Sequence, residues 1–225
     1  MTALEALFNG RLPALVMFDL EGTLIDSVPD LAAAVNQMLA TRGHPAVDLD
    51  QVRGWVGNGA ATLVQRALAN AEGNQAAEDR LDAVALTEFL AAYADQNQGT
   101  TVYPGVQECL AWLRARDVPL AVITNKPERF VGPLLKQLQL GAFRWVIGGD
   151  TLSVQKPDPA GLLQVMRDAG VSAEQCVLIG DSRNDVLAAR AAGVKVIAVS
   201  YGYNYGRPVA QENPDLLVDS LDSLI

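Results

Sequence analysis

Short hydrophobic runs recur along the chain and carry the clearest structural signal in the sequence. Five of them are rich in Val and Ile and do not alternate with polar residues: 14–18, 119–124, 145–147, 176–179 and 194–199. Runs of this kind are typical of strands buried on both faces of a parallel sheet. Helical patterns lie between most of the runs, near 105–116, 128–139, 158–169 and 183–192, and a weaker run at 216–219 indicates an edge strand. The alternation of strand and helix predicts a doubly wound, Rossmann-like α/β core with a parallel sheet.

The interval from about residue 28 to residue 101 interrupts this rhythm, because it contains no convincing strand. Helical patterns cover 29–41, 50–70 and 77–95 instead. Ser27 precedes Val28 and Pro29, so we expect its side chain to cap the first of these helices. The run Tyr103-Pro104-Gly105 then marks the return to the core. We therefore expect two domains: a core formed by 1–27 and 102–225, and a helical cap domain formed by 28–101.

Composition narrows the class of protein. Half of the 225 residues are hydrophobic, which is enough for a sizeable core. The net charge is −9 and Lys and Arg do not cluster, so we expect no nucleic-acid partner. No hydrophobic stretch approaches the length of a membrane span and the first residues lack a signal-peptide pattern, so we expect a cytoplasmic protein without a membrane partner. The two cysteines, Cys109 and Cys176, are expected to fill core space. Monomer and homodimer both remain open.

Polar and charged side chains follow the predicted strands, where ligands bind in open parallel sheets. The first strand leads to Asp19, Glu21, Thr23 and Asp26, the second to Thr124, Asn125 and Lys126, the third to Lys156, and the fourth to Asp181 and Asp185. Carboxylates that crowd together repel one another unless a cation joins them. Oxygen ligands of this kind suit Mg²⁺, which uses one or two carboxylates, keeps several waters and binds substrate phosphate. The sequence therefore predicts Mg²⁺ as a cofactor at this edge of the sheet.

These residues resemble the four motifs of the haloacid dehalogenase-like phosphohydrolases, and they occur in the same order. They are Asp19-Leu20-Glu21-Gly22-Thr23 for the motif Asp-x-Asp-x-Thr, Thr124 at the end of the next strand, Lys156-Pro157-Asp158-Pro159 for the lysine motif, and Gly180-Asp181-Ser182-Arg183-Asn184-Asp185 for the motif Gly-Asp-x-x-x-Asp. The helical insertion resembles the type-I cap of this superfamily. Within the superfamily, the segments 52–59 and 201–206 are similar to those of the phosphoglycolate phosphatase family.

The resemblance implies a role for most of the acidic residues. Asp19 would be the nucleophile that forms an aspartyl-phosphate, and because a carboxylate is a weak nucleophile it needs a metal and other cations around the phosphate. The metal would be held by the side chains of Asp19 and Asp181 and by the main-chain carbonyl of Glu21. Asp185 would hold a metal-bound water or orient Lys156. Lys156 would pair with both Asp19 and the transferring phosphoryl group.

The resemblance also implies which residues bind the substrate, a small anionic phosphomonoester. Thr124 and the amides beside it, including Asn125, would bind phosphoryl oxygens together with Lys156. The cap would exclude water once it is shut. A glycolate carboxylate needs a positive or hydrogen-bonding receptor, for which the cap offers Arg53, Gly57 and Asn58. A position of Arg53 on a solvated helix face is an equally good interpretation.

Glu21 departs from the family motif, which has an aspartate at this position. In phosphatases of the family, this residue is the general acid that protonates the leaving alkoxide and then the general base that activates water. Glutamate keeps the charge, but its extra methylene moves the carboxylate by roughly an ångström, and misplacements of that size cost about 100-fold in rate. We therefore expect an assembled site with slowed turnover. The sequence does not distinguish a natural glutamate from an introduced one.

The resemblance implies a Mg²⁺-dependent phosphatase that converts 2-phosphoglycolate to glycolate and phosphate. Two alternatives remain open: a phosphatase for another small phosphoester, such as a sugar phosphate, and a phosphate-binding protein that has lost turnover through Glu21. A phosphomutase is less favoured, because Glu21 would have to shield the intermediate from water while still moving protons. A dehalogenase is disfavoured, because its first motif needs neither a second acid nor Mg²⁺.

Overall fold

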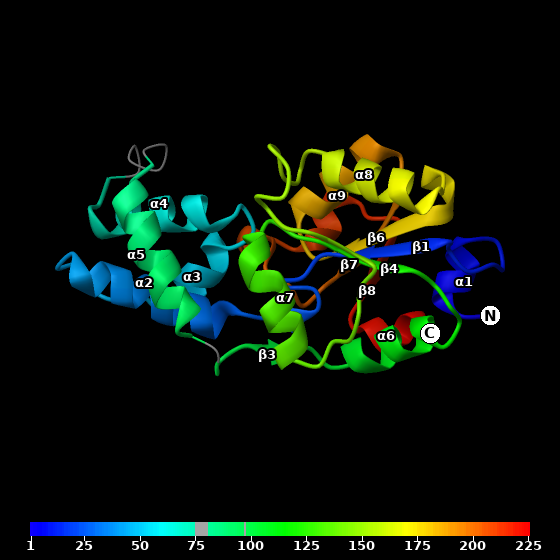
Figure 1. Ribbon diagram of the computed structural model, residues 1–225, viewed down its shortest axis with the longest axis horizontal. Helices are drawn as coiled ribbons and strands as arrows, with labels where there is room; N and C mark the ends of the chain where they lie inside the picture. The colour runs from blue at the N-terminus through cyan, green and yellow to red at the C-terminus, as the bar shows by residue number, and fades with distance from the viewer. Residues whose placement is uncertain (75–80, 97) are drawn as a thin grey trace.

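The computed structural model describes residues 1–74, 81–96 and 98–225, and its centre is a six-stranded sheet (Figure 1). The strands are β1 (Leu15–Phe18), β4 (Leu120–Ile123), β5 (Trp145–Ile147), β6 (Cys176–Gly180), β7 (Lys195–Val199) and β8 (Leu216–Val218). They pair in the order β5-β4-β1-β6-β7-β8, and each neighbouring pair is parallel. The five predicted core strands, the edge strand at 216–219 and the doubly wound α/β fold are confirmed.

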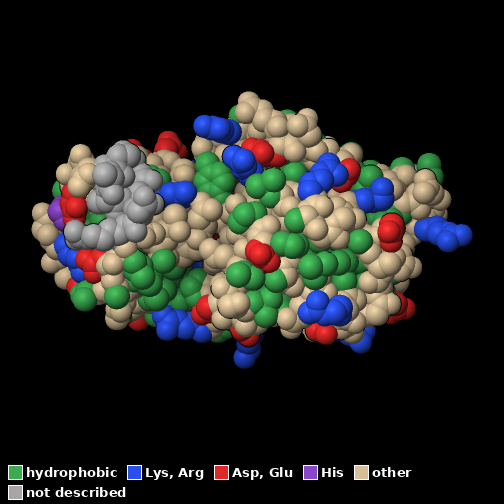
Figure 2. Space-filling view, turned by 90° about the horizontal axis from the view of Figure 1, so that it is seen from above, with side chains coloured by type: hydrophobic (Ala, Val, Ile, Leu, Met, Phe, Trp, Pro, Cys, Tyr) green, Lys and Arg blue, Asp and Glu red, His purple; other side chains and the backbone are tan. Residues whose placement is uncertain are grey.

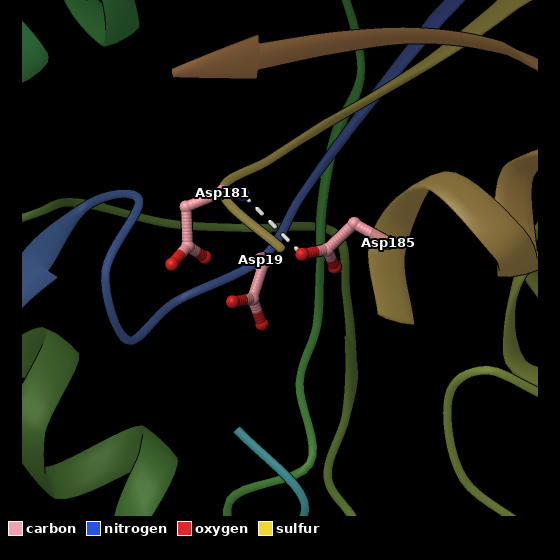
Figure 3. Close-up of side chains that lie close together, drawn as sticks. All are labelled: Asp19, Asp181 and Asp185. Carbon is pink, nitrogen blue, oxygen red and sulfur yellow. Dashed lines mark hydrogen bonds between the residues drawn. The ribbon is translucent and has the colours of Figure 1, made fainter. Parts of the chain in front are cut away.

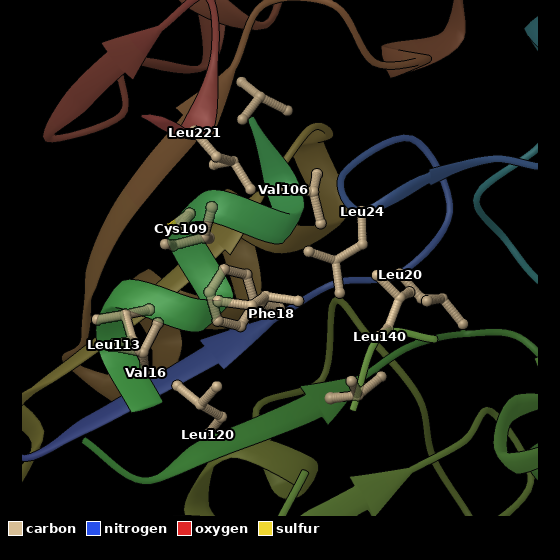
Figure 4. Close-up of a cluster of buried hydrophobic side chains, with 14 of the residues drawn as sticks. Val16, Phe18, Leu20, Leu24, Val106, Cys109, Leu113, Leu120, Leu140 and Leu221 are labelled. Atoms are coloured by element: carbon tan, nitrogen blue, oxygen red, sulfur yellow. The ribbon is translucent and has the colours of Figure 1, made fainter. Parts of the chain in front are cut away.

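Helices cover both faces of the sheet, because each strand places alternate side chains on opposite sides. The four helices are α6 (Val106–Arg114), α7 (Glu128–Gln137), α8 (Ala160–Ala169) and α9 (Arg183–Ala192), as predicted apart from small differences at their ends. Val16 and Phe18 pack on the side of α6 and α7, in the cluster drawn in Figure 4. Leu15 and Met17 pack on the side of α8 and α9. Figure 1 shows the two helix pairs on opposite sides of the sheet.

Four further helices form a bundle with its own hydrophobic cluster, at the left of Figure 1. They are α2 (Val28–Thr41), α3 (Leu49–Trp55), α4 (Ala60–Ala71) and α5 (Ala83–Ala94). The expectation of one helix over 50–70 is wrong, because the chain leaves helical geometry between α3 and α4. Gly57 and Gly59 have φ angles of 120° and 86°, which glycine adopts readily and a right-handed helix does not contain. Of the helix expected over 77–95, residues 77–80 lie outside the described residues.

A short antiparallel ribbon holds together the two chain crossings between the bundle and the sheet. β2 (Ile25–Asp26) pairs with β3 (Thr101–Val102), next to the domain boundaries expected from the sequence. Two-residue strands leave no hydrophobic pattern, so the sequence does not predict this ribbon. The short helix α1 (Ala3–Leu7) is also absent from the sequence-based expectations, and it buries Leu4 against the sheet.

Ser27 does not cap α2, so that expectation is wrong. Its backbone already lies in the right-handed helical region, and its side chain makes no cap hydrogen bond. The Asp26 carboxylate instead accepts a hydrogen bond from the amide of Val28 (3.2 Å). The Ser27 hydroxyl donates to Glu21 (2.8 Å), so it is directed toward the end of β1 rather than toward the helix.

Charged side chains are mixed over the face of the molecule seen in Figure 2, where Lys and Arg lie singly among Asp and Glu. This face therefore has no continuous basic surface of the kind that nucleic acid requires. Among the described helices, none combines the length and the hydropathy needed to cross a bilayer.

β1 lies at the point where the strand order reverses, with β4 on one side and β6 on the other. In open α/β sheets, the crevice beyond the carboxyl ends of such strands is the usual place for a ligand. The helical bundle lies beyond these same carboxyl ends (Figure 1). The space between the helical bundle and the ends of β1, β4 and β6 is therefore the place where a ligand is expected.

Candidate active site

Three buried carboxylates meet at the carboxyl ends of the central strands, as Figure 3 shows. Asp19 follows β1, Asp181 follows β6, and Asp185 lies in the first turn of α9. One oxygen of each carboxylate lies within 4.8 Å of the corresponding oxygens of the other two. The three residues are 7%, 2% and 1% exposed. The fold thus joins the first and fourth motifs into one acidic cluster.

Lys156 is the cation of this cluster. Its ammonium group lies 2.7 Å from Asp19 Oδ1 and 2.6 Å from Asp185 Oδ1. Burial alone would lower the pKa of Lys156, but the carboxylates of Asp185 and Asp19 outweigh it and raise the pKa above its usual value. The lysine therefore stays protonated and holds a positive charge against Asp19.

Both oxygens of Asp185 have protein donors. Oδ1 accepts from Lys156, and Oδ2 accepts from the Ser182 hydroxyl (2.7 Å), the Ser182 amide (3.1 Å) and the Asp181 amide (3.3 Å). The hydrogen bond from the Ser182 amide is part of a capping box at the start of α9. Of the two roles expected for Asp185, this geometry supports the orientation of Lys156.

Asp19 and Asp181 carry negative charge that Lys156 alone does not balance. Burial raises the pKa of Asp19 to about 6, although Lys156 opposes the shift. Burial, followed by the carboxylates of Asp19 and Asp185, raises the pKa of Asp181 well above its usual value. Carboxylates that are costly to ionise without a further cation form a donor set that fits a hard divalent ion such as Mg²⁺.

The Asp181 carboxylate is held from two directions. The Thr23 hydroxyl donates to Oδ1 (3.1 Å), and the main-chain amide of Tyr203 donates to Oδ2 (2.7 Å). Gly22, which has a φ angle of +87°, passes so close that a Cβ at this position would overlap the carboxylate. The first motif and the 201–206 segment therefore position the same acidic side chain.

The Glu21 side chain lies outside the acidic cluster and is bound on the side of the helical bundle. Its Oε1 accepts from the Ser27 hydroxyl (2.8 Å) and from the Lys126 ammonium group (2.7 Å). Lys126 in turn donates to the hydroxyl of Tyr93 in α5 (2.7 Å). The metal contact expected through the main-chain carbonyl of Glu21 stays a prediction, and it would not involve this side chain.

Thr124 and Asn125 follow β4. The Thr124 hydroxyl accepts from the Lys126 amide (3.2 Å). Asn125 Nδ2 donates to the carbonyls of Gly57 and Lys156, both at 2.9 Å, so this side chain connects the bundle to the lysine loop. Asn125 Oδ1 is buried and has no hydrogen-bond partner within the described parts of the chain. The amide donors of Asn125 are therefore in use, and its acceptor is open.

The segment between α3 and α4 is fastened to the sheet-containing part through its carbonyl groups. Gly57 O accepts from Asn125 (2.9 Å) and from Asn184 Nδ2 (3.0 Å), and Asn58 O accepts from Gln155 Nε2 (3.0 Å). These contacts join the two parts of the molecule. Contact of Gly57 and Asn58 with a substrate stays a prediction.

Arg53 lies beside the chain crossing. Its Nη2 is 3.5 Å from Asp26 Oδ2, and its guanidinium carbon is 5.4 Å from the centroid of the Tyr203 ring. The side chain is 35% exposed. Two cavities flank Glu21, and Arg53 is not among the described residues that line either of them.

The two cavities are small and differ in chemistry. The acidic cavity, of about 20 Å³, is lined by residues that include Asp19, Asp181, Lys156, Thr124 and Asn125. The apolar cavity, of about 30 Å³, is lined mainly by hydrophobic residues of the bundle together with Lys126 and Tyr93. Both are lined by Glu21, Val56, Gly57 and Gly59. At about 10–15 Å³ for each water, they hold only a few water molecules.

Sequence reasoning gave no role at the site to four residues that the structure places there: Ser27, Tyr93, Lys126 and Tyr203. For Lys126 there was a usable signal, because it follows Thr124 and Asn125 at the end of a predicted strand. Tyr93 comes from the face of a helix in the bundle, where an aromatic residue is indistinguishable from core. Tyr203 acts on Asp181 through its main chain, which a sequence does not reveal.

Known proteins resemble this chain over most of its length. Residues 16–199 match the family model of the haloacid dehalogenase-like hydrolases. The phosphoglycolate phosphatase of Pseudomonas fluorescens is 58% identical and phosphoglycolate phosphatase 1 of Pseudomonas aeruginosa is 56% identical, and each match covers 100% of this chain and 83% of the relative. A crystal structure from Haemophilus somnus, described as a predicted phosphoglycolate phosphatase, superimposes with a TM-score of 0.83 at 36% identity and covers 93% of this chain and 95% of that one.

Proposed function

Because this chain belongs to the haloacid dehalogenase-like hydrolases, within the phosphoglycolate phosphatase family, we propose that it hydrolyses 2-phosphoglycolate to glycolate and phosphate. It is a phosphoric monoester hydrolase, as its relatives are. The observation that carries the proposal is the buried set of Asp19, Lys156 and Asp181 at the carboxyl ends of the central strands. The proposed nucleophile Asp19, the cation Lys156 and the proposed metal ligand Asp181 thus lie close together.

Asp19 is the nucleophile in this proposal. One of its carboxylate oxygens bonds to phosphorus while the bond from phosphorus to the glycolate oxygen breaks, which gives an aspartyl-phosphate and glycolate. Water then attacks the aspartyl-phosphate, which releases phosphate and restores Asp19. Lys156, 2.7 Å from Asp19, is well placed to stabilise negative charge on the phosphoryl group in both steps.

Glu21 is the proposed general acid and base. It gives a proton to the departing glycolate oxygen in the first step and takes a proton from the attacking water in the second. Two observations support the assignment: Glu21 lines the cavity that contains Asp19, and Ser27 and Lys126 hold its carboxylate in a defined position. Its extra methylene is expected to slow both steps.

Mg²⁺ is the proposed cofactor, because the excess of buried carboxylates in the acidic cluster fits a divalent cation. The side chains of Asp19 and Asp181 and the main-chain carbonyl of Glu21 would hold it. When bound, it supplies positive charge that screens Asp19 from the substrate phosphate. The Thr124 hydroxyl and the main-chain amides around Asn125 are proposed to bind phosphoryl oxygens on the opposite side.

The helical bundle is proposed to be a cap domain, residues 28–101, on a catalytic core formed by 1–27 and 102–225. Its separate hydrophobic cluster and the β2–β3 ribbon at the two chain crossings support this division. The proposed partner is a small anionic ester, and the proposed location of the enzyme is the cytoplasm.

The test is steady-state release of phosphate from 2-phosphoglycolate, with Mg²⁺ and with EDTA, beside a panel of sugar phosphates. We expect the highest kcat/KM for 2-phosphoglycolate, loss of activity with EDTA, and loss of turnover in Asp19→Asn. Asp168→Asn is the matched control, since Asp168 is exposed on α8. Preference for a sugar phosphate would replace the substrate assignment. Binding of phosphate without hydrolysis of any ester would instead indicate a phosphate-binding protein.

A further inference from the structure

The apolar cavity contains one cation among its described lining residues, Lys126. Its walls are largely hydrophobic and include Leu31 of α2, Leu63 of α4, Phe89 of α5 and Phe130 of α7. The Lys126 side chain is only 2% exposed. A buried ammonium group in hydrophobic surroundings needs acceptors and negative charge. The cavity is therefore suited to a small ligand group that is anionic at one end.

Lys126 and Tyr93 have hydrogen-bond donors to spare. The ammonium group donates to Glu21 Oε1 and to Tyr93 Oη, each at 2.7 Å, and lies 4.2 Å from the centroid of the Tyr93 ring. An ammonium group has three donors, so one remains for a further acceptor. The Tyr93 hydroxyl accepts from Lys126, and among the described residues no hydrogen bond uses its own hydrogen. A carboxylate, which has two acceptor oxygens, matches this pair of donors.

The apolar cavity adjoins the acidic cavity, and Glu21 lines both. In the proposed function, on which this inference rests, the phosphoryl group lies at Asp19 and the ester oxygen faces Glu21. The rest of a short alcohol then extends past Glu21 toward Lys126. We propose that Lys126, together with Tyr93, binds the carboxylate of the leaving alcohol and so selects phosphate esters of short hydroxy acids.

Substrate binding then exchanges one ion pair for another. The substrate carboxylate takes the spare donors of Lys126 and Tyr93 and draws the ammonium group away from Glu21, which keeps the Ser27 hydroxyl and is free to turn toward the ester oxygen. An ester without the carboxylate cannot make this exchange, and it leaves Lys126 tied to Glu21. Sites that hydrogen-bond a substrate group reject analogues lacking that group, because buried polar groups are then left unpaired.

The competing explanation is that Lys126 only positions Glu21, and a pair of substrates separates the two. The esters are 2-phosphoglycolate and 2-hydroxyethyl phosphate, in which a hydroxymethyl group replaces the carboxylate. Their kcat/KM values are measured for the wild type, Lys126→Met, Tyr93→Phe and the control Lys136→Met, whose lysine is exposed on α7. Inhibition by glycolate is measured alongside, since the product carries the same carboxylate.

We expect Lys126→Met to lower the ratio of kcat/KM values, 2-phosphoglycolate over 2-hydroxyethyl phosphate, by roughly 10- to 100-fold, the effect of losing a charge-assisted hydrogen bond. Tyr93→Phe should lower it roughly fivefold, as for a neutral hydrogen bond. Both should weaken inhibition by glycolate, and Lys136→Met should leave the ratio unchanged.

An equal loss for both esters in Lys126→Met would overturn the proposal, because a residue that only positions Glu21 affects every ester alike. Hydrolysis of 2-phosphoglycolate by the wild type would then still uphold the proposed function. A wild type that hydrolyses other esters but not 2-phosphoglycolate would remove the proposed function, and the carboxylate receptor with it. If circular dichroism shows that Lys126→Met does not fold, the ratio in Tyr93→Phe decides, and no change there overturns the proposal.

Discussion

Glu21 departs from the motif Asp-x-Asp-x-Thr, which has an aspartate at this position. Its Oε1 reaches Ser27 and Lys126 at 2.8 and 2.7 Å, a position that depends on the full length of a glutamate. Glu21→Asp withdraws the carboxylate from Lys126 toward the acidic cavity, and we expect kcat on 2-phosphoglycolate to rise about 100-fold. Steady-state kinetics measures this, with Glu21→Gln as the control that keeps the length and removes the acid, at a loss of about 10²–10⁴-fold. Equal rates with glutamate and aspartate would show that Ser27 and Lys126 already correct for the methylene.

As the proposed metal ligands, Asp19 and Asp181 should set a lower pH limit on metal binding. Burial raises the pKa of Asp19 to about 6 and that of Asp181 well above its usual value. A metal binds the deprotonated carboxylates, so protons compete with it at and below these pKa values. As pH falls through 6, the affinity for Mg²⁺ should drop by up to about tenfold for each pH unit.

The rise in Tm on adding Mg²⁺ measures this dependence, because a ligand that binds only the folded state stabilises it according to its affinity. The increment should be large well above pH 6 and small well below it, and Asp168→Asn should behave as the wild type. An increment that does not vary across this range would contradict the assignment of Asp19 and Asp181 as ligands.

At the scale of single residues, the sequence locates the residues of the site, but it predicts their contact partners less well. The acids and the motif lysine could be located because each follows a hydrophobic run in a fixed order along the chain. The partner of Glu21 could not be predicted, because Lys126 is 105 positions away and its orientation depends on Tyr93 in the bundle. Ser27 was expected to cap a helix because it precedes Val28 and Pro29, but its hydroxyl donates to Glu21 instead.

Among the elements, α2 is tied to the returning chain by one buried side chain. Asp30 in its first turn accepts hydrogen bonds from the amides of Gly99 (2.8 Å) and Thr100 (2.9 Å) and from the Thr100 hydroxyl (2.6 Å). Asp30→Asn points an amide donor at these donors, and we expect it to lower the free energy of unfolding by about 2 kcal/mol. Urea denaturation measures the loss, with Asp168→Asn as the control. A loss no larger than that of the control would mean that the first turn of α2 does not depend on this anchor.

The elements themselves were predictable where their pattern is long and local. The core strands are unbroken Val- and Ile-rich runs, and the helices between them have a clear period. The helical pattern over 50–70 did not show the break between α3 and α4, where Gly57 and Gly59 adopt positive φ angles. The β2–β3 ribbon was missed because each strand has only two residues and the two strands are separated by the whole inserted segment, so the sequence shows no local pattern for the pairing.

For the whole molecule, the sequence predicts a core and an insertion but not how they meet. Part of the surface between them consists of amide side chains and carbonyl groups, which are too common in any sequence to indicate a contact. Asn125 and Asn184 donate to Gly57 O, and Gln155 donates to Asn58 O. The acidic cavity enclosed by these contacts, of about 20 Å³, has too little room for a phosphoryl group with glycolate attached. We therefore expect these hydrogen bonds to open before the proposed substrate enters.

A contact that must break for substrate to enter opposes binding by its own free energy. Gln155→Ala removes one of these contacts, so we expect KM for 2-phosphoglycolate to fall by up to about fivefold, with a smaller change in kcat. Hydrogen exchange at residues 56–59 should become faster, because the segment is held by fewer bonds. Gln107→Ala is the matched control, since that side chain is exposed and donates to Leu138 O away from the site. A rise in KM would show instead that the hydrogen bond from Gln155 to Asn58 persists over the bound substrate, and that the cap gains its affinity from closing rather than from opening.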